Sequence, residues 1–403
     1  MKQDLRHVSC PVCGYSLATT FFNPGQYPLA TLGWPESADK ATAMARQELD
    51  FVQCPACTHV WNRAFDPDCI PYQENPNRMF NAGTAWSGHL ADTRDLILAE
   101  MPSDPVVIDI GCGEGHFVRG LGEALEGKGR FIGFDLNAAD ETGGGIEFHQ
   151  QYFDPLMDMA IYNPDAVVIR HVIEHLVEPS HFLEQLAWGA RGSERPCLLF
   201  VEVPCIDRVF ETARLSDFFY EHTSHFTTKS FAHLMSKAGN VKHLGHGYGE
   251  EVVFALVELA VPNGIAESAD LATRFEQRSH NSRLAIQQHL SELKACGATV
   301  AIWGGTGKAA AFMQYFSVDP EGFPLVVDSD PGKVGSFVPG IGQEIVGVEA
   351  LKGVELDAVI IPSQWRAKDI VREMETLNIC SKQVLIEHEG TLIDFHRTSH
   401  PYR

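Results

Sequence analysis

Residues 106–117 read VVIDIGCGEGHF, and this stretch decides the fold of the middle of the chain. The β-branched residues around Asp109 predict a buried parallel strand. The glycines that follow allow a tight turn and a close approach of the backbone to a ligand, and a helix is expected to begin near His116. The stretch therefore predicts a strand, a glycine-rich loop and a helix N-terminus within an α/β fold.

A second strand is predicted at residues 130–134, directly before Asp135. A carboxylate at this position can accept hydrogen bonds from the hydroxyl groups of a ribose. A nicotinamide-dinucleotide fingerprint reads G-x-G-x-x-G and faces a pyrophosphate. Residues 109–115 read D-x-G-x-G-x-G instead, which resembles the S-adenosylmethionine (SAM) loop of class I methyltransferases, where the leading acid serves the amino-acid end of SAM. A structural turn without a ligand is the alternative.

Length and charge bound the remaining possibilities. The 403 residues exceed what one hydrophobic core usually serves, so two or three domains are expected. The formal net charge of −22 argues against a nucleic-acid or anionic-membrane partner. No apolar run approaches the ~20 residues that span a bilayer, and residues 1–6 lack a signal-peptide core. We expect a cytoplasmic protein that acts on a small molecule, either as a monomer or as a homodimer.

Four of the ten cysteines form two C-P-x-C pairs. Two such turns can bring four thiolates to one tetrahedral zinc ion, and because no position is left open for water the site would be structural. The predicted zinc ligands are Cys10, Cys13, Cys54 and Cys57. Two unrelated thiol pairs or a redox dithiol are the alternative. His59 and Cys69 are assigned structural roles.

A third strand is predicted at residues 145–153. A fourth is predicted at residues 165–170, followed directly by a helix that holds His175. Ligands of open α/β sheets lie beyond the carboxyl ends of the strands, so Arg170 and His171 are expected where a methyl group would be delivered. His175 either faces the same way or packs in the core. The predicted SAM-binding residues are Asp109, Gly111, Cys112, Gly113, Gly115, Phe117, Asp135, Leu136, Arg170 and His171.

Residues 217–226 read DFFYEHTSHF and follow a fifth strand at residues 198–204. A histidine titrates near neutral pH and can abstract a proton, and Glu221 can raise the basicity of His222. Tyr220 or His171 can stabilise an oxyanion. A metal or packing cluster is the alternative. The candidate catalytic residues are His222, Glu221, Tyr220, His171, His175 and His225.

The order of these motifs resembles that of the SAM-dependent sugar C-methyltransferases, which act on nucleotide-activated deoxysugars in antibiotic biosynthesis. The resemblance rests on the two cysteine pairs with G-x-x-P-L-A between them, the loop at 109–115, R-H-V-x-E-H at 170–175 and E-H at 221–222. It implies a zinc-binding domain (1–75), a class I methyltransferase Rossmann-like domain (76–263) and a second, smaller Rossmann-like domain (264–403). It also implies a dTDP-linked keto-deoxysugar as acceptor and places His222 at the family's proposed base.

The C-terminal part repeats a strand and a glycine turn in residues 298–308, ATVAIWGGTGK. This turn is not a P-loop, because a glycine is missing at Ile302 and a Ser or Thr at Ala309. It either cradles part of a sugar nucleotide or is an empty Rossmann scaffold. An amphipathic helix over residues 267–297 is expected to join this domain to the preceding one.

The expected reaction is C-methylation through an enolate formed by a histidine base. An O- or N-methyltransferase of another small molecule, or a SAM-binding protein without turnover, are the alternatives. The chain departs from the family at three places. Phe219 and either Phe80 or Met79 stand where tyrosines are usual, and residues 247–251 read GYGEE where G-G-S-x-R is usual. Two hydroxyls and a cation are therefore missing. Either Tyr220 and Tyr248 take over from neighbouring positions, or the acceptor differs from the usual dTDP-sugar, and we favour the changed acceptor.

Overall fold

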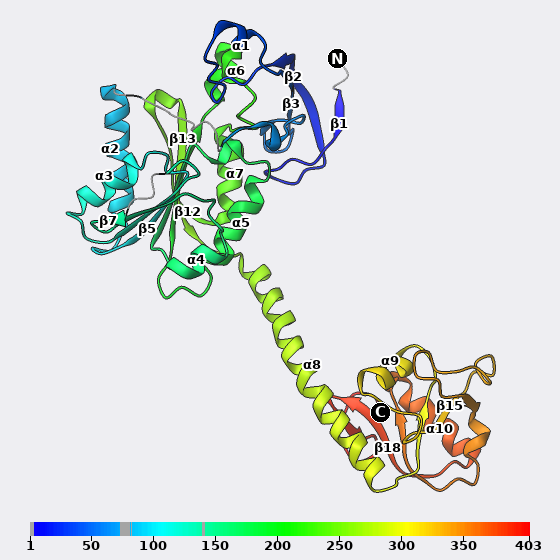
Figure 1. Cartoon of the computed structure of the whole chain (residues 1–403). Helices are drawn as coiled ribbons and strands as arrows, with labels where there is room; N and C mark the ends of the chain where they lie inside the picture. Colours follow the sequence, from blue (N-terminus) through cyan, green and yellow to red (C-terminus); the bar gives the residue numbers. More distant parts are fainter. Residues whose placement is uncertain (1–3, 73–80, 82, 139–141) are drawn as a thin grey trace. The chain divides into compact units, whose positions relative to one another are not determined.

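A computed structural model describes the chain apart from residues 1–3, 73–80, 82 and 139–141. The chain divides into two compact units, Met1–Ile265 and Ala266–Arg403, which are coloured from blue to green and from yellow to red in Figure 1. The first unit contains a five-stranded and an eight-stranded sheet, and the second contains a six-stranded sheet. The division into three domains remains a prediction.

The five-stranded sheet is antiparallel and combines the N-terminal region with a short strand from far along the chain. Its order is β1 (Leu5–His7), β2 (Leu17–Tyr27), β3 (Gln47–Gln53), β4 (Val60–Asn62) and β11 (Ser224–His225). β11 pairs Ser224 with Trp61, and the backbone N–H of Asn62 donates to the Thr223 carbonyl at 2.8 Å. The segment that holds the predicted catalytic histidines is therefore bound to the edge of the N-terminal sheet.

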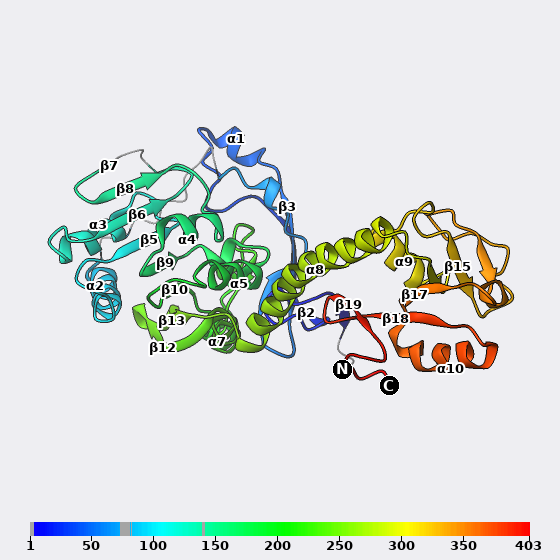
Figure 2. The ribbon, with the colours of Figure 1, turned by 90° about the horizontal axis from the view of Figure 1, so that it is seen from below.

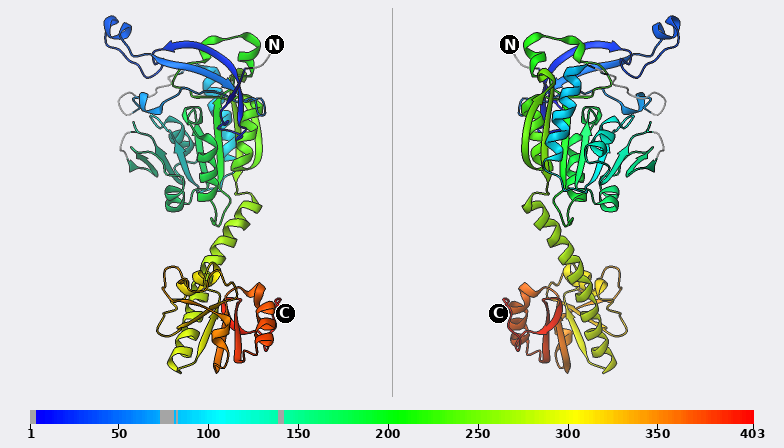
Figure 3. Two further views of the ribbon diagram at one scale, coloured as in Figure 1. Left: turned by 90° about the vertical axis from the view of Figure 1, so that its right-hand side faces the viewer. Right: turned by 90° about the vertical axis from the view of Figure 1, so that its left-hand side faces the viewer.

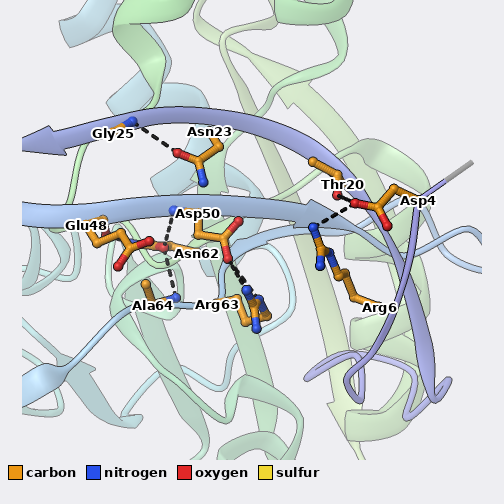
Figure 4. Close-up of polar contacts among 10 residues, drawn as sticks. All are labelled: Asp4, Arg6, Thr20, Asn23, Gly25, Glu48, Asp50, Asn62, Arg63 and Ala64. Carbon is orange, nitrogen blue, oxygen red and sulfur yellow. Dashed lines mark hydrogen bonds and ion pairs between the residues drawn. The ribbon is translucent and has the colours of Figure 1, made fainter.

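Asn62 satisfies the backbone where β3 and β4 diverge (Figure 4). Its side-chain oxygen accepts from the backbone N–H groups of Asp50 at 3.0 Å and Ala64 at 3.1 Å, and its Nδ2 donates to the Glu48 carbonyl at 3.2 Å. Arg63 forms an ion pair with Asp50. Asn62 is buried, and buried polar groups need hydrogen-bond partners. Its hydrogen bonds therefore stabilise the part of the sheet where β11 pairs with β4.

The eight-stranded sheet is the scaffold of the candidate site, with the order β12-β13-β10-β9-β5-β6-β8-β7. Its strands are β5 (Val106–Ile110), β6 (Arg130–Phe134), β7 (Thr142–Gly143), β8 (Ile146–His149), β9 (Ala166–Arg170), β10 (Leu198–Pro204), β12 (Gly239–Gly247) and β13 (Val252–Leu259). The five strands from β8 to β10 are parallel, and β13 and β12 continue the sheet in antiparallel pairing. The chain order reverses between β5 and β9, which is where open α/β sheets bind ligands.

Helices cover both faces of this sheet (Figures 1 and 2). α2 (Thr84–Leu98) and α3 (His116–Ala124) lie on one face, and α4 (Met157–Tyr162), α5 (Pro179–Gly189) and α7 (Thr228–Ala238) lie on the other. Alternate strand residues enter the two cores: Val107 belongs to the α3 side and Ile108 to the α5 side. Two short helices, α1 (Ala38–Thr42) and α6 (Asp207–Thr212), lie outside these layers.

The prediction of a helix directly after β9 is wrong. A short 3-10 turn, η2 (Ile173–His175), follows β9, and α5 begins only at Pro179. Proline is favoured in the first turn of a helix, and it disfavours helical backbone in the residue before it, so a continuous helix cannot run through Glu178. His171 has a φ of 54°, a left-handed conformation that non-glycine residues rarely adopt. This bend turns the chain out of the sheet and into the candidate site.

The second unit has a mixed six-stranded sheet with the order β16-β15-β14-β17-β18-β19. Its strands are β14 (Val300–Trp303), β15 (Leu325–Asp328), β16 (Ile345–Gly347), β17 (Leu356–Ile361), β18 (Ser381–His388) and β19 (Thr391–Asp394). α8 (Asn263–Ala295) and α9 (Lys308–Tyr315) cover one face, and α10 (Ala367–Leu377) covers the other, as Figure 3 shows. The predicted α/β class and the Rossmann-like methyltransferase fold are confirmed.

Within the part of the chain that the structure describes, no helix combines the length and apolarity needed to cross a membrane.

Candidate active site

The glycine-rich loop after β5 is held so closely that side chains have no room at two of its positions. Gly111 has a φ of 71°, and a Cβ there would lie 2.2 Å from a methyl group of Val172. Gly115 has a φ of 76°, and a Cβ would lie 2.3 Å from the ring of Phe148. Left-handed backbone and close packing both require glycine here. The loop is a preformed backbone cradle at the point where the sheet order reverses.

The two predicted acids lie at the ends of neighbouring strands on this cradle. Asp135 accepts hydrogen bonds from the backbone N–H groups of Gly113 at 3.0 Å and Asn137 at 2.8 Å. Asp109 is 3% exposed. Burial raises the pKa of Asp109 to about 7, and the charge of Asp135 acts in the same direction while that of Arg170 opposes it. A buried acid and a half-buried acid beside a backbone cradle fit the two ends of SAM.

The other predicted SAM-binding residues surround this cradle. Arg170 places its guanidinium 4.6 Å from the ring centre of Phe117 and 5.5 Å from that of Trp86. Leu136 is half-buried directly after Asp135. Burial raises the pKa of the Cys112 thiol, so this cysteine remains an uncharged part of the wall. The roles of all these residues remain predictions.

Sequence reasoning missed Glu202, which is the centre of a buried polar network. Its carboxylate binds His89 Nε2 at 2.6 Å and the Arg170 guanidinium at 2.8 Å, and it is fully buried. Burial alone would raise the pKa of this carboxyl, but His171, His89 and the charge of Arg170 hold it well below its usual range. The available signal was an acid in an otherwise apolar strand, next to a strand that ends in an arginine.

His171 lies between two carboxylates. Its Nε2 is 3.2 Å from Glu202 Oε1, and its Nδ1 is 3.5 Å from Glu174 Oε1. Burial lowers the pKa of His171, but Glu174 and Glu202 outweigh this effect and raise it to about 9. His171 is therefore an imidazolium at neutral pH, and it brings a fixed positive charge to the carboxyl end of β9.

His175 and His222 face each other across the site, with ring centres 4.8 Å apart. His175 Nδ1 donates to the Glu221 carbonyl at 2.7 Å. His222 also lies against Phe219, with ring centres 4.3 Å apart. Burial lowers the pKa of His222 well below its usual value, and three neighbouring histidines lower it further. His222 is therefore neutral at pH 7 and can accept a proton.

Two other candidate catalytic residues, Glu221 and Tyr220, form hydrogen bonds with the backbone of the N-terminal region. The Glu221 carboxylate accepts from the backbone N–H groups of Thr31 at 2.6 Å and Leu32 at 3.1 Å. The Tyr220 hydroxyl exchanges hydrogen bonds with the backbone of Asp66. These hydrogen bonds tie both side chains to the N-terminal region. The roles of Glu221 in raising the basicity of His222 and of Tyr220 in stabilising an oxyanion remain predictions.

His225 is a core residue in β11. Its ring is 4.8 Å from that of Phe218 and 5.2 Å from that of Phe51, and its Nε2 donates to the Asp217 carbonyl at 3.1 Å. Burial lowers its pKa to about 4, although the hydrogen bond to Asp217 opposes the shift. Only 4% of its surface is exposed, whereas His222 is half-buried. A catalytic role for His225 remains a prediction.

The segment that departs from the sugar-methyltransferase pattern is paired to nearby arginines. Glu251 forms an ion pair with Arg214 at 2.7 Å, and Glu250 lies 3.6 Å from Arg208. The ring of Tyr248 lies 5.1 Å from that of Trp86. The two acids are therefore partly neutralised. Phe80 and Met79, the other departures, lie outside the described residues.

The two cysteine pairs converge on one point. The Sγ atoms of Cys10 and Cys57 are 3.6 Å apart, and those of Cys13 and Cys54 are 3.5 Å apart. Tetrahedral zinc with Zn–S bonds of about 2.3 Å would place its sulfurs about 3.8 Å apart. The four thiols can hold a metal ion, and zinc remains the proposed one. His59 stacks beside Trp61 in the adjoining core.

Two family models match the chain. Residues 85–241 match a methyltransferase domain, and residues 250–384 match a C-methyltransferase C-terminal domain. The first match contains the glycine-rich loop, Glu202 and the facing histidines. No curated protein matches the chain.

Several solved structures are similar to part of the chain. A Haloferax volcanii methyltransferase in complex with the Trm112 activator is 16% identical, with 44% of this chain and 90% of that chain covered and a TM-score of 0.34. A SAM-dependent methyltransferase from Aquifex aeolicus is 16% identical, with 49% of this chain and 100% of that chain covered and a TM-score of 0.31. The magnesium protoporphyrin IX methyltransferase of Synechocystis PCC 6803 with bound SAH is 15% identical over 45% and 90% of the two chains, with a TM-score of 0.32.

Proposed function

We propose that this chain, a SAM-dependent methyltransferase, methylates a carbon atom beside a ketone of a small molecule. The observation that carries the proposal is the placement of two histidines in one site: the His222 ring lies 4.8 Å from that of His175, and His171 lies between the carboxylates of Glu174 and Glu202. The match to a C-methyltransferase C-terminal domain supports carbon as the methylated atom.

Two histidines with pKa values shifted in opposite directions suit the two halves of an enolisation. Carbon becomes nucleophilic only when a neighbouring carbonyl takes up the negative charge as an oxyanion. His222 is neutral and takes the proton from the carbon. The positive charge of His171, held between Glu174 and Glu202, stabilises the negative charge on oxygen. Environments that separate two pKa values in this way are typical of acid and base roles.

Bound SAM supplies an electrophilic methyl group that the enolate carbon can attack. Asp109, Asp135 and the glycine cradle are the residues that would bind it, and the guanidinium of Arg170 lies over the ring of Phe117, at the start of the helix that follows the cradle. Arg170 is held by Glu202 and by two aromatic rings, so its guanidinium is fixed. We infer that it closes the site against water, which would otherwise return a proton to the enolate.

For the acceptor we propose a nucleotide-activated keto-deoxysugar, other than the ordinary dTDP-4-keto-deoxysugars. The motif order of the chain supports the class. The change of acceptor is supported by Phe219, which offers the site a ring but no hydroxyl, and by Glu250 and Glu251, which stand in place of a cation. A site that loses hydrogen-bonding groups loses strong discrimination for the substrate that used them.

Solvent exchange tests the base, because only an enolising enzyme catalyses deuterium exchange into a ketone without methyl transfer. We expect exchange into a matching ketosugar with SAM omitted, and its loss in His222→Asn. His181→Asn, an exposed histidine on α5, is the matched control. Methylation of an oxygen or nitrogen atom without any exchange would overturn the proposal, as would SAM binding with no turnover on any acceptor.

A screen of acceptors tests the sugar. dTDP-, GDP-, CDP- and UDP-ketosugars are to be compared with ketones that carry no phosphate. Efficient methylation of an ordinary dTDP-4-keto-deoxysugar would contradict the changed acceptor, and activity on phosphate-free ketones alone would contradict the sugar nucleotide.

A further inference from the structure

Glu174, His175 and His222 form a second group of metal-ligating side chains, separate from the four cysteines. One ligand atom from each lies within 4.8 Å of the other two. We propose that these residues bind a divalent transition-metal ion such as Zn²⁺, and that the ion reversibly blocks the site.

Glu174 is the residue that points most directly to a cation. It is 1% exposed, and neither of its carboxylate oxygens has a hydrogen-bond partner within the described chain. The Nδ1 atom of His171 lies 3.5 Å from Oε1 of Glu174. A buried carboxylate without hydrogen bonds is costly, and the positive charge of His171 offsets only part of this cost because it forms no hydrogen bond with either oxygen. A metal ion would satisfy the oxygen atoms that His171 leaves without a hydrogen bond.

His175 has the arrangement that metal-binding histidines usually have. Its Nδ1 donates to the Glu221 carbonyl at 2.7 Å, which fixes the ring and leaves the lone pair on Nε2. The Tyr72 hydroxyl lies 3.2 Å from the same Nδ1 and restrains the ring further. His175 also belongs to the same short turn as Glu174, so the two side chains are carried on one fixed piece of backbone.

His222 completes the group from the opposite side. Its ring is nearly perpendicular to that of His175, at 80°, and it packs against Phe219. Ligands about 2.0–2.2 Å from a zinc ion lie roughly 3–4 Å apart. The three side chains therefore need only small rotations to close on an ion.

The type of ligand indicates the type of metal. Two imidazoles and one carboxylate suit Zn²⁺ and Fe²⁺, whereas Mg²⁺ and Ca²⁺ prefer oxygen ligands alone. Three protein ligands also leave a coordination position for water, in contrast with the closed four-cysteine group. We therefore expect the ion to exchange more readily than the one bound by the cysteines.

The blocking effect rests on the proposed function. A histidine cannot accept a proton while its lone pair is bound to a metal ion, so the metal-loaded enzyme has lost its base. Binding of the metal, by contrast, does not depend on the proposed reaction.

Cobalt titration of the full-length protein tests the site. The protein is first loaded with one zinc ion at the cysteines, and Co²⁺ is then added and followed by its visible absorption. We expect one further ion per chain, bound more than about tenfold more weakly in Glu174→Gln and in His222→Gln. His181→Asn is the control, and SAM calorimetry checks that each variant is folded. Absence of a further ion, or equal affinity in Glu174→Gln, would overturn the site.

Deuterium exchange then tests the block. We expect Zn²⁺ or Co²⁺ at saturating concentration to abolish exchange into the ketone, and a chelator to restore it. Metal binding that leaves exchange unchanged or increases it would overturn the block. If no exchange occurs even in the chelator-treated enzyme, the proposed function fails, while the cobalt titration still decides the metal site.

Discussion

The carboxylate of Glu202 lies 2.8 Å from the guanidinium of Arg170, its partner in register on the neighbouring strand. The same carboxylate binds His89 and lies beside His171, so one fully buried acid orders three basic groups. The basic groups in turn keep the acid ionised. Such a network is sensitive to the loss of any one member, because a buried charge left without a partner is costly.

Glu202→Gln should therefore lower the free energy of unfolding by about 3–5 kcal/mol, the usual cost of breaking a buried ion pair. It should also lower the pKa of His171, because one of the two carboxylates that raise it is gone. Denaturant unfolding and histidine NMR titration measure the two effects. Glu211→Gln, an exposed acid on α6, is the control and should change neither. An unchanged pKa of His171 would contradict the role of Glu202.

His222→Asn should leave SAM affinity unchanged and lower turnover by ~10²-fold or more, because a positioned base usually contributes that much. Turnover with a ketosugar and calorimetry with SAM measure the two quantities. Turnover equal to that of the unaltered protein would transfer the role of base to another residue.

The pH dependence should have two limbs. The pKa of His222 is lowered, so the acidic limb should lie well below pH 6.5. The pKa of His171 is raised to about 9, so activity that needs its positive charge should fall as the pH rises through about 9. The stabilising contribution of His171 should be complete below pH 6.5 and should disappear over the same alkaline range. A rate profile for His171→Gln should lack the alkaline limb, and retention of that limb would contradict the assignment.

Asp135→Ala should weaken SAM binding by roughly 1–3 kcal/mol, because the partners of a lost carboxylate are left unpaired. Calorimetry measures this, and Asp95→Ala on the exposed side of α2 is the matched control. Tighter binding of NAD than of SAM to the unaltered protein would overturn the SAM site.

Cys13→Ser should reduce bound zinc from about one ion per chain and lower the stability of the fold, because metal binding contributes to folding. Metal analysis and thermal unfolding check this. A purified protein that contains no metal and is equally stable would contradict the proposal that the four cysteines bind zinc.

Much of the fold could be predicted because the signals are local. The strand, loop and acid at residues 106–115 occupy neighbouring positions in sequence and in space, and the same holds for Asp135 after β6. The bend after β9 was missed because the proline that delays α5 lies eight residues after His171, while the apolar pattern across this segment is continuous.

Residues 217–226, which hold most of the candidate catalytic side chains, were harder to predict, because contacts with distant parts of the chain decide which way these side chains point. Glu221 and His222 are adjacent in sequence, yet the acid faces the N-terminal segment and the histidine faces His175. The pairing of β11 with β4 anchors the chain shortly after these two residues, and it joins segments that are far apart in sequence. Glu202 was missed for a related reason, since its partners come from two elements that are far apart in sequence: His89 from α2, and Arg170 and His171 from the end of β9.

The position of β11 also limits how this protein can be recombined with others. A chimera made by exchanging the first 75 residues would leave behind the strand that pairs with Trp61, the carboxylate that holds Thr31 and the hydroxyl that holds Asp66. A working graft would have to carry residues 220–225 along with the N-terminal region. The natural unit of exchange is therefore discontinuous in sequence, and an inherited change in the N-terminal region and one beside His222 are expected to arise together.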